Sequence, residues 1–118
     1  MIRVTADCLF CKIVAGEIPA DVVLSTDTTL AFRDVNPKAP THVLVVTRAH
    51  YADAAALAAA DPALAGEVLR TAAAVAEHDG VVESGYRLVF NTGTSAGQSV
   101  SHVHSHVLGG RPFAWPPG

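Results

Sequence analysis

Three histidines occupy alternate positions in one short segment, His102-Val103-His104-Ser105-His106-Val107-Leu108. Side chains on a β-strand alternate between its two faces, so a strand here directs all three imidazoles to the same side. A row of imidazoles is costly to bury unless each ring has a partner, and protonating all three would be repulsive. The segment therefore predicts a strand over 101–108 with a functional face of histidines.

Hydrophobic patterns and turn residues predict four further strands. Short strands over 22–25 and 30–33 flank a polar turn at 26–28, which favours antiparallel pairing. A β-branched run predicts a strand over 41–47 that is buried on both faces. Another strand is expected over 86–91.

Helix signals lie before and between these strands. Asp61 followed by Pro62 marks the start of the main helix, which Gly80 ends. A short helix is expected over 8–15, capped by Asp7, with Leu9, Phe10 and Ile13 facing inward. The alanine-rich stretch 54–60 is also read as helix. These elements predict an α+β fold with a five-stranded antiparallel sheet, one main helix and a short N-terminal helix.

Composition limits the classes of protein to consider. The 118 residues are half hydrophobic and 16% charged, which is typical of one globular domain spanning 1–118. The net charge of −3, with the basic residues scattered along the chain, argues against a nucleic-acid partner. No apolar run is long enough for a membrane span, and Met1–Thr5 does not resemble a secretory leader. The expected location is the cytoplasm.

A loop rich in glycine and small hydroxyl residues, 91–99, directly precedes the histidine row. Such a loop can direct several backbone N–H groups toward one anion, as phosphate-binding loops do. With the imidazoles beside it, the loop favours a nucleophile acting on a phosphate. A metal cluster is the alternative, because imidazoles two residues apart are common ligands. No Asp or Glu adjoins the row to complete such a site.

Cys8 and Cys11 form a C-x-x-C pair. In a reducing compartment this spacing indicates half of a metal site or a redox pair before it indicates a disulfide. A thioredoxin-like pair is disfavoured because no strand precedes Cys8. Two buried thiols without a joint role are the remaining interpretation.

Longer stretches carry a resemblance to a known family. The run GQSVSHVHSHVLGGR and the ending WPPG resemble the histidine triad superfamily, specifically its Hint-type nucleotide-binding branch. The likeness extends to LFCKIVAGEIPA and AFRDVNPKAPTHVLVV. Two positions depart from the family pattern. Ser105 replaces a usual hydrophobic residue on the face away from the histidines, and Ser101 stands where an aromatic residue is frequent.

The resemblance implies a homodimer with a continuous ten-stranded sheet that hydrolyses nucleoside phosphoramidates such as AMP–amine adducts. The middle histidine, His104, would be the nucleophile and would carry a covalent nucleotidyl group. His106 would stabilise the phosphate, and Ser99 would assist the leaving amine. With His102 these residues form the expected catalytic set, and no cofactor is required. Alternatives are a dinucleoside polyphosphate hydrolase, a nucleotidyl transferase, or a purine-nucleotide-binding adaptor with incidental activity.

The resemblance also assigns binding residues. Asp34 matches the carboxylate that holds the ribose hydroxyls, and His42 matches a fourth histidine near the triad. An apolar slot for the purine comprises Leu9, Phe10, Phe32, Val35 and Leu44. The phosphate-loop positions are Asn91, Gly97, Gln98 and Ser99. A structural zinc site, as in several bacterial members, would comprise Cys8, Cys11, His50 and His102.

Overall fold

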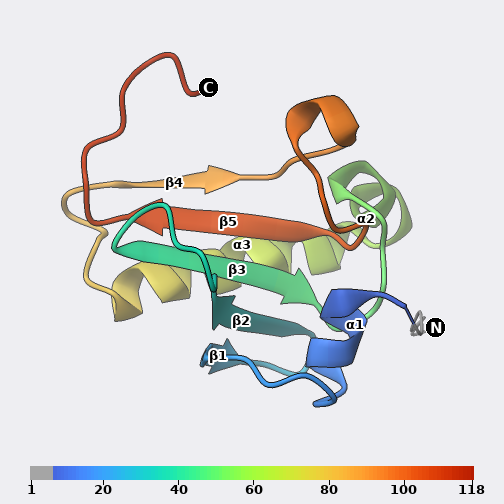
Figure 1. Ribbon diagram of the computed structural model, residues 1–118. Coiled ribbons are helices and arrows are strands. Elements are labelled where there is room, and N and C mark those ends of the chain that lie inside the picture. Colours follow the sequence, from blue (N-terminus) through green and yellow to red (C-terminus); the bar gives the residue numbers. More distant parts are fainter. Residues whose placement is uncertain (1–6) are drawn as a thin grey trace.

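A five-stranded antiparallel sheet of order β1-β2-β3-β5-β4 forms the centre of the structure (Figure 1). The computed structural model describes residues 7–118, so Met1–Thr5, considered above as a leader, lies outside them. The strands are β1 (Val22–Ser25), β2 (Thr29–Arg33), β3 (Thr41–Thr47), β4 (Tyr86–Val89) and β5 (His104–Gly109). The predicted α+β class and antiparallel sheet are confirmed.

The central strand β3 directs alternate side chains to the two faces of the sheet. All seven of its residues are buried, as its β-branched sequence predicts. Val43 and Val45 face the core under α3, whereas Leu44 and Val46 pack with Phe10 on the side of α1. In the β3–β5 register, Leu44 lies opposite His106 and Val46 opposite His104. Facing residues in a sheet share a face, so the histidines belong to the α1 side.

Three α-helices surround the sheet: α1 (Leu9–Val14), α2 (Ala54–Ala60) and α3 (Pro62–His78). The Asp61 carboxylate caps α3 by accepting from the Leu64 N–H, and Gly80 follows its end with φ +70°. The apolar residues that recur at helical spacing along α3 are buried: Leu64, Val68, Ala72, Val75 and Ala76. None of the helices within residues 7–118 is long and apolar enough to cross a membrane.

An ion pair fixes the end of α3 to the sheet. The Asp79 carboxylate accepts two N–H bonds from Arg33 of β2, each 2.9 Å, and a hydroxyl bond from Thr41 of β3 at 2.8 Å. Hydrogen bonding from the guanidinium holds the pKa of Asp79 well below its usual range. Asp79 thus joins the end of β2 and the start of β3 to the end of α3, on the side of the sheet opposite α1.

Several element boundaries differ from the predictions. Strand β5 begins at His104, because the Val103 N–H bonds to Tyr51 O at 2.7 Å instead of joining the sheet ladder. Strand β4 ends at Val89, which pairs with His106 near the start of β5. The cap of α1 is Cys8 and not Asp7, because Cys8 Sγ accepts from the Cys11 N–H at 3.4 Å. Leu9, which the helical spacing predicts to face inward, is 44% exposed and borders the cavity between α1 and the sheet.

Candidate active site

The three imidazoles of the row lie on the α1 side of the sheet. Strand β5 carries His104 and His106, and His102 immediately precedes it. The Phe10 ring from α1 meets two of them edge-on, with centroids 6.0 Å from His102 and 5.0 Å from His104. His104 and His106 are 5.0 Å apart between centroids. The alternation predicted from the sequence therefore produces one face of histidines.

His104 is held in one tautomer by the backbone. Its Nδ1 lies 2.7 Å from the carbonyl oxygen of His102. A carbonyl can only accept, so Nδ1 carries a hydrogen and the neutral ring keeps its lone pair on Nε2. The residue is 7% exposed, and its ring borders the cavity described below. This arrangement can present an unprotonated nitrogen to an electrophile.

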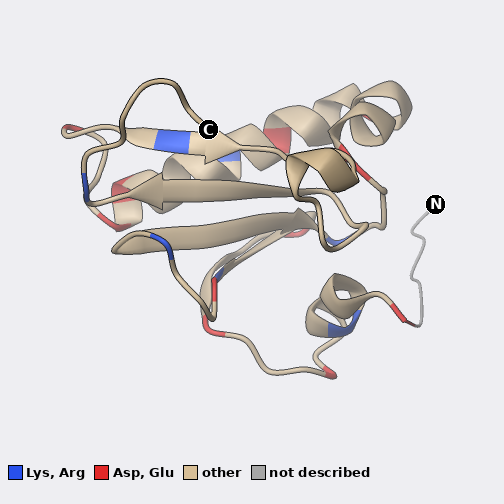
Figure 2. Cartoon of the chain, turned by 45° about the horizontal axis from the view of Figure 1, so that its top comes forward, with Lys and Arg blue, Asp and Glu red and all other residues tan. Residues whose placement is uncertain are grey.

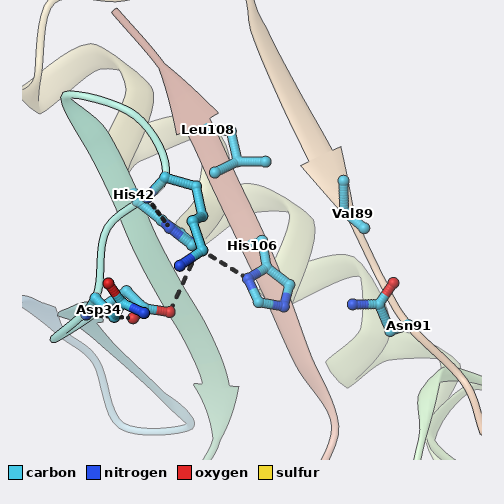
Figure 3. Close-up of a pocket in the computed structure, with 8 residues that line it drawn as sticks. Asp34, His42, Val89, Asn91, His106 and Leu108 are labelled. Carbon is cyan, nitrogen blue, oxygen red and sulfur yellow. Dashed lines mark hydrogen bonds and ion pairs between the residues drawn. The ribbon is translucent and has the colours of Figure 1, made fainter. Parts of the chain in front are cut away.

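His106 is connected to Asp34 through His42 of β3 (Figure 3). The Lys38 N–H donates to His42 Nδ1 at 3.0 Å, so a hydrogen on His42 must reside on Nε2. This Nε2–H donates to His106 Nδ1 at 2.9 Å, with Asp34 Oδ2 at 3.4 Å. His106 then accepts at Nδ1 and carries its own hydrogen on Nε2.

Burial keeps this pair of imidazoles neutral. Desolvation lowers the pKa of His42 below its ordinary value. Desolvation, and then the neighbouring His104 and His42, lower the pKa of His106 to about 4. At neutral pH, His106 is therefore an uncharged N–H donor that can bond to a phosphate oxygen. Because the ring carries no charge, it does not repel the imidazoles of His42 and His104.

A cavity of about 590 Å³ lies between α1, the sheet and the loop before β5. Its volume falls in the usual range for small-molecule sites. Nine residues selected from the sequence line it: Leu9, Phe10, Phe32, Asp34, Val35, Leu44, Ser99, His104 and His106. Apolar side chains form one wall and the two imidazoles another.

A second hollow of about 350 Å³ adjoins the first at Asp34 and His106. It contains two more of the expected binding residues, His42 and Asn91 (Figure 3). The strands bordering both hollows, β3 and β5, contain no Lys, Arg, Asp or Glu (Figure 2). These two strands therefore offer a phosphate neutral N–H and O–H donors, and the charged residues that line the hollows, including Arg33, Asp34 and Lys38, come from other segments.

Two expected phosphate-loop residues line neither hollow. Gly97 closes a short 3₁₀ turn in the left-handed region, with φ +90°. Gln98 uses its side chain within the protein: Oε1 accepts from the Gly93 N–H at 2.9 Å, and Nε2 donates to Ala52 O at 2.8 Å. Both residues shape the loop that carries Ser99.

Sequence reasoning missed several wall residues and one backbone donor. Ile13, Ile18, Arg33 and Val100 also line the larger cavity. Ile13, Ile18 and Val100 have no pattern that distinguishes them from ordinary core residues, and the Arg33 side chain pairs with Asp79. The donor is the Lys38 N–H, which bonds to His42 Nδ1. The residue type does not predict a bond that the backbone makes.

The cysteine pair meets two histidines in a compact cluster. Cys8 Sγ lies 3.4 Å and Cys11 Sγ 3.6 Å from His102 Nδ1. His50 Nδ1 lies 3.3 Å from Cys11 Sγ and 3.1 Å from His102 Nδ1. All four ligand atoms are within 4.8 Å of one another, so the cluster could hold a metal ion.

The chemistry of this cluster fits a tetrahedral ion. A zinc ion with two sulfur and two nitrogen ligands places its ligand atoms about 3.3–3.8 Å apart, close to the spacings found here. His102 donates its other ring hydrogen, on Nε2, to Thr47 O at 2.7 Å. Metal-binding histidines usually have such an outer bond, because it leaves the second nitrogen free to ligate. His102 is fully buried.

Comparisons with known proteins agree with this geometry. The HIT domain family model matches residues 15–113. The chain is 50% identical over 112 residues to an uncharacterized HIT-like protein of Synechococcus elongatus, covering 95% of this chain and 97% of that protein. It is 42% identical over 105 residues to the purine nucleoside phosphoramidase of Escherichia coli K12, covering 89% and 88%.

A solved structure gives the same answer for the fold. The HIT family hydrolase from Legionella pneumophila Philadelphia 1 superposes with a TM-score of 0.91 at 48% identity, covering 95% of this chain and all of that one. These matches confirm the resemblance drawn from the histidine row and its neighbouring segments. The chain belongs to the HIT domain family.

Proposed function

We propose that this protein hydrolyses nucleoside phosphoramidates through a covalent nucleotidyl group on His104. The observation that carries the proposal is the 2.7 Å bond from His104 Nδ1–H to His102 O, which leaves Nε2 as the free nitrogen of the neutral ring. The cavity beside that ring has the size and apolar wall that a nucleotide requires. The similarity to the phosphoramidase of E. coli K12 and to the hydrolase of L. pneumophila supports the reaction class.

In this proposal, the purine occupies the apolar wall and the ribose hydroxyls bond to Asp34. His104 Nε2 attacks phosphorus, and the bond from phosphorus to the amine nitrogen breaks. The amine leaves with a proton from the Ser99 hydroxyl or from water. Water then attacks the adduct, releases the nucleoside monophosphate and restores the free imidazole. His106 Nε2–H donates to a phosphate oxygen, where negative charge develops.

The cysteine–histidine cluster would hold a structural zinc ion. Cys8, Cys11, His50 and His102 supply all four ligands, so no position remains for water or substrate. The ion would stabilise the start of α1 against the segment that precedes β5. A reducing compartment such as the cytoplasm would keep both thiols available as ligands.

The proposed assembly is a homodimer. Strand β4 is at the edge of the sheet, and all four of its residues are half-buried. Pairing of two β4 strands would satisfy the open backbone edge and create a ten-stranded sheet. Light scattering should then give twice the 12.2 kDa mass of one chain. A single-chain mass at micromolar concentration would contradict this assembly.

The function is tested by comparing wild type with His104→Ala on an AMP–amine substrate. Loss of the nucleophile should lower turnover at least about a thousandfold. Calorimetry should show that AMP binding persists, because the base and ribose contacts remain. Negligible wild-type turnover with intact binding would identify an adaptor instead. Faster cleavage of a dinucleoside polyphosphate would identify the alternative hydrolase, and activity lost on chelation before any loss of folding would identify metal-dependent chemistry.

A further inference from the structure

The C-terminal segment contacts the loop that controls the His42–His106 pair. Arg111, just after β5, donates from Nε to the carbonyl oxygen of Lys38 at 3.1 Å. The N–H of the same Lys38 donates to His42 Nδ1 at 3.0 Å. One residue of the loop is therefore held on one side by the C-terminal segment and bonds on its other side to a site histidine.

The same segment makes a second close contact with the loop, between Gly110 and Pro40. Gly110 adopts φ +87°, and a Cβ placed there would lie 2.8 Å from Pro40 Cβ. Only glycine tolerates both the backbone conformation and this approach. Gly110 and Arg111 thus contact the loop at Pro40 and at Lys38, on either side of Ala39.

The C-terminal segment is itself anchored to β4. The Phe113 ring contacts two guanidinium groups, with Arg111 Cζ 4.3 Å and Arg87 Cζ 5.2 Å from its centroid. Arg87 also donates to Ala114 O at 2.7 Å. Arg87 fixes the segment but makes no contact with the loop among the hydrogen bonds of residues 7–118, so it offers a matched comparison for Arg111.

The bond from Lys38 to His42 selects one protonation form. A hydrogen already on His42 Nδ1 would collide with the incoming N–H, which excludes both the other neutral tautomer and the imidazolium ion. The remaining form donates from Nε2 to His106 Nδ1 at 2.9 Å. His106 must then carry its hydrogen on Nε2. The direction of each N–H in the pair is therefore determined by the position of the Lys38 amide.

We propose that Gly110 and Arg111 form a clamp on the Lys38 loop that sets the tautomers of His42 and His106. Arg111 is a positioning residue, since it acts through the Lys38 backbone. The inference rests on the proposed function, in which His106 Nε2–H stabilises the phosphate. It extends that function by making the donor at the phosphate depend on a contact outside the cavity.

The test combines nitrogen-15 NMR of the histidine rings with kinetics on an AMP–amine substrate, for wild type, Arg111→Ala, Arg111→Lys and Arg87→Ala. In ligand-free wild type, His42 should be the Nε2–H tautomer. Arg111→Ala should give a mixture of tautomers and lower kcat about three- to tenfold, the equivalent of one hydrogen bond, with KM changed less than about twofold. Arg111→Lys, which can still donate to the Lys38 carbonyl, should restore part of both.

Arg87→Ala should leave the ring spectra and kcat unchanged, although it loosens the same C-terminal segment. Unchanged tautomers in Arg111→Ala would overturn the clamp, as would equal changes in Arg87→Ala. Gly110→Ala, compared with wild type at equal folded fraction, should change the tautomers of the histidine rings in the same sense as Arg111→Ala. A wild-type spectrum for Gly110→Ala would also contradict the clamp. Because the spectra need no substrate, they decide the clamp even if phosphoramidate turnover is absent.

Discussion

The two ends of the histidine row use one residue type for opposite purposes. At one end His102 lies among Cys8, Cys11 and His50, and at the other His106 lies beside His42 and Asp34. In each cluster the ligand atoms lie within 4.8 Å of one another, so distance alone does not separate them. The difference is in the backbone groups that contact the rings.

At the first end, the Thr47 carbonyl takes the Nε2 hydrogen of His102, and the lone pair on Nδ1 faces two sulfur atoms. At the second end, the Lys38 amide occupies the lone pair of His42 Nδ1, so a hydrogen remains on Nε2 between the rings. A carbonyl partner thus prepares a ligand, whereas an amide partner prepares a hydrogen-bond donor. The first cluster fits a cation and the second fits an anionic substrate.

The largest effect should come from removing a ligand of the first cluster. Cys11→Ser should abolish the single bound metal equivalent, because a serine hydroxyl is a poor zinc ligand. With free zinc at a thousand times its Kd, the stability lost should be about 4 kcal/mol. Elemental analysis and urea unfolding measure the two quantities. His42→Ala is the matched change at the other end and should keep the metal, so loss of metal there would remove the distinction between the clusters.

The second cluster should reveal itself in the pH dependence of stability. The pKa of His106 falls from 6.5 to about 4 on burial, so between these values the unfolded chain binds a proton that the folded chain does not. The contribution of neutral His106 to the free energy of unfolding is fully present above pH 6.5 and is lost as the pH falls toward 4. Urea unfolding at pH 7 and pH 4.5 should show wild type losing about 2–3 kcal/mol more than His106→Asn. Parallel profiles would contradict a neutral, buried His106.

A smaller effect is expected from the carboxylate beside His42. Asp34→Asn keeps the shape and can still accept the Asn36 N–H bond of 2.8 Å, but it removes the charge offered to the ribose. A hydrogen bond to a charged group contributes about 1.5–3 kcal/mol, so the Kd for AMP should rise at least tenfold, measured by calorimetry. The metal content should not change. Unaltered AMP affinity would exclude Asp34 from the ribose site.

The smallest effect is expected from Ser105, which lies on the face of β5 opposite the histidines. Ser105 is fully buried, and its Oγ has no hydrogen-bond partner within the described chain. Ser105→Ala removes that unpaired group and should stabilise the protein by up to about 1 kcal/mol in urea unfolding, with kcat unchanged. Ser101→Ala, at an exposed position, should have no effect. Destabilisation by Ser105→Ala would mean that the hydroxyl has a partner in solution.

The parts of the fold that are visible in the sequence are those with regular periods. The β-branched run of β3 and the helical spacing of α3 each determine a buried face, and the alternation in 102–106 determines the face of the imidazoles. Strand β5 begins three residues later than the sequence predicts, because the Val103 N–H bonds to the Tyr51 carbonyl, 52 residues earlier in the chain, and not to a strand partner. Local pattern does not encode such a choice.

The candidate site follows the same division. The resemblance to the histidine triad superfamily indicated the cysteine–histidine cluster and the lining of the larger cavity. The tautomers of His102 and His42 could not be inferred, because they depend on backbone groups of Thr47 and Lys38. The Lys38 loop is in turn contacted by Arg111, 73 residues away in the sequence. Only the folded arrangement brings these groups together.

The central claim is that His104 carries the nucleotidyl group, and trapping that species tests it most directly. Wild type mixed with an AMP–amine substrate and quenched in acid within milliseconds should gain the mass of one adenylyl group, located by fragmentation to the His104 peptide. His104→Ala should gain none. An adduct on another residue, or rapid wild-type turnover with no adduct at any quench time, would contradict the account.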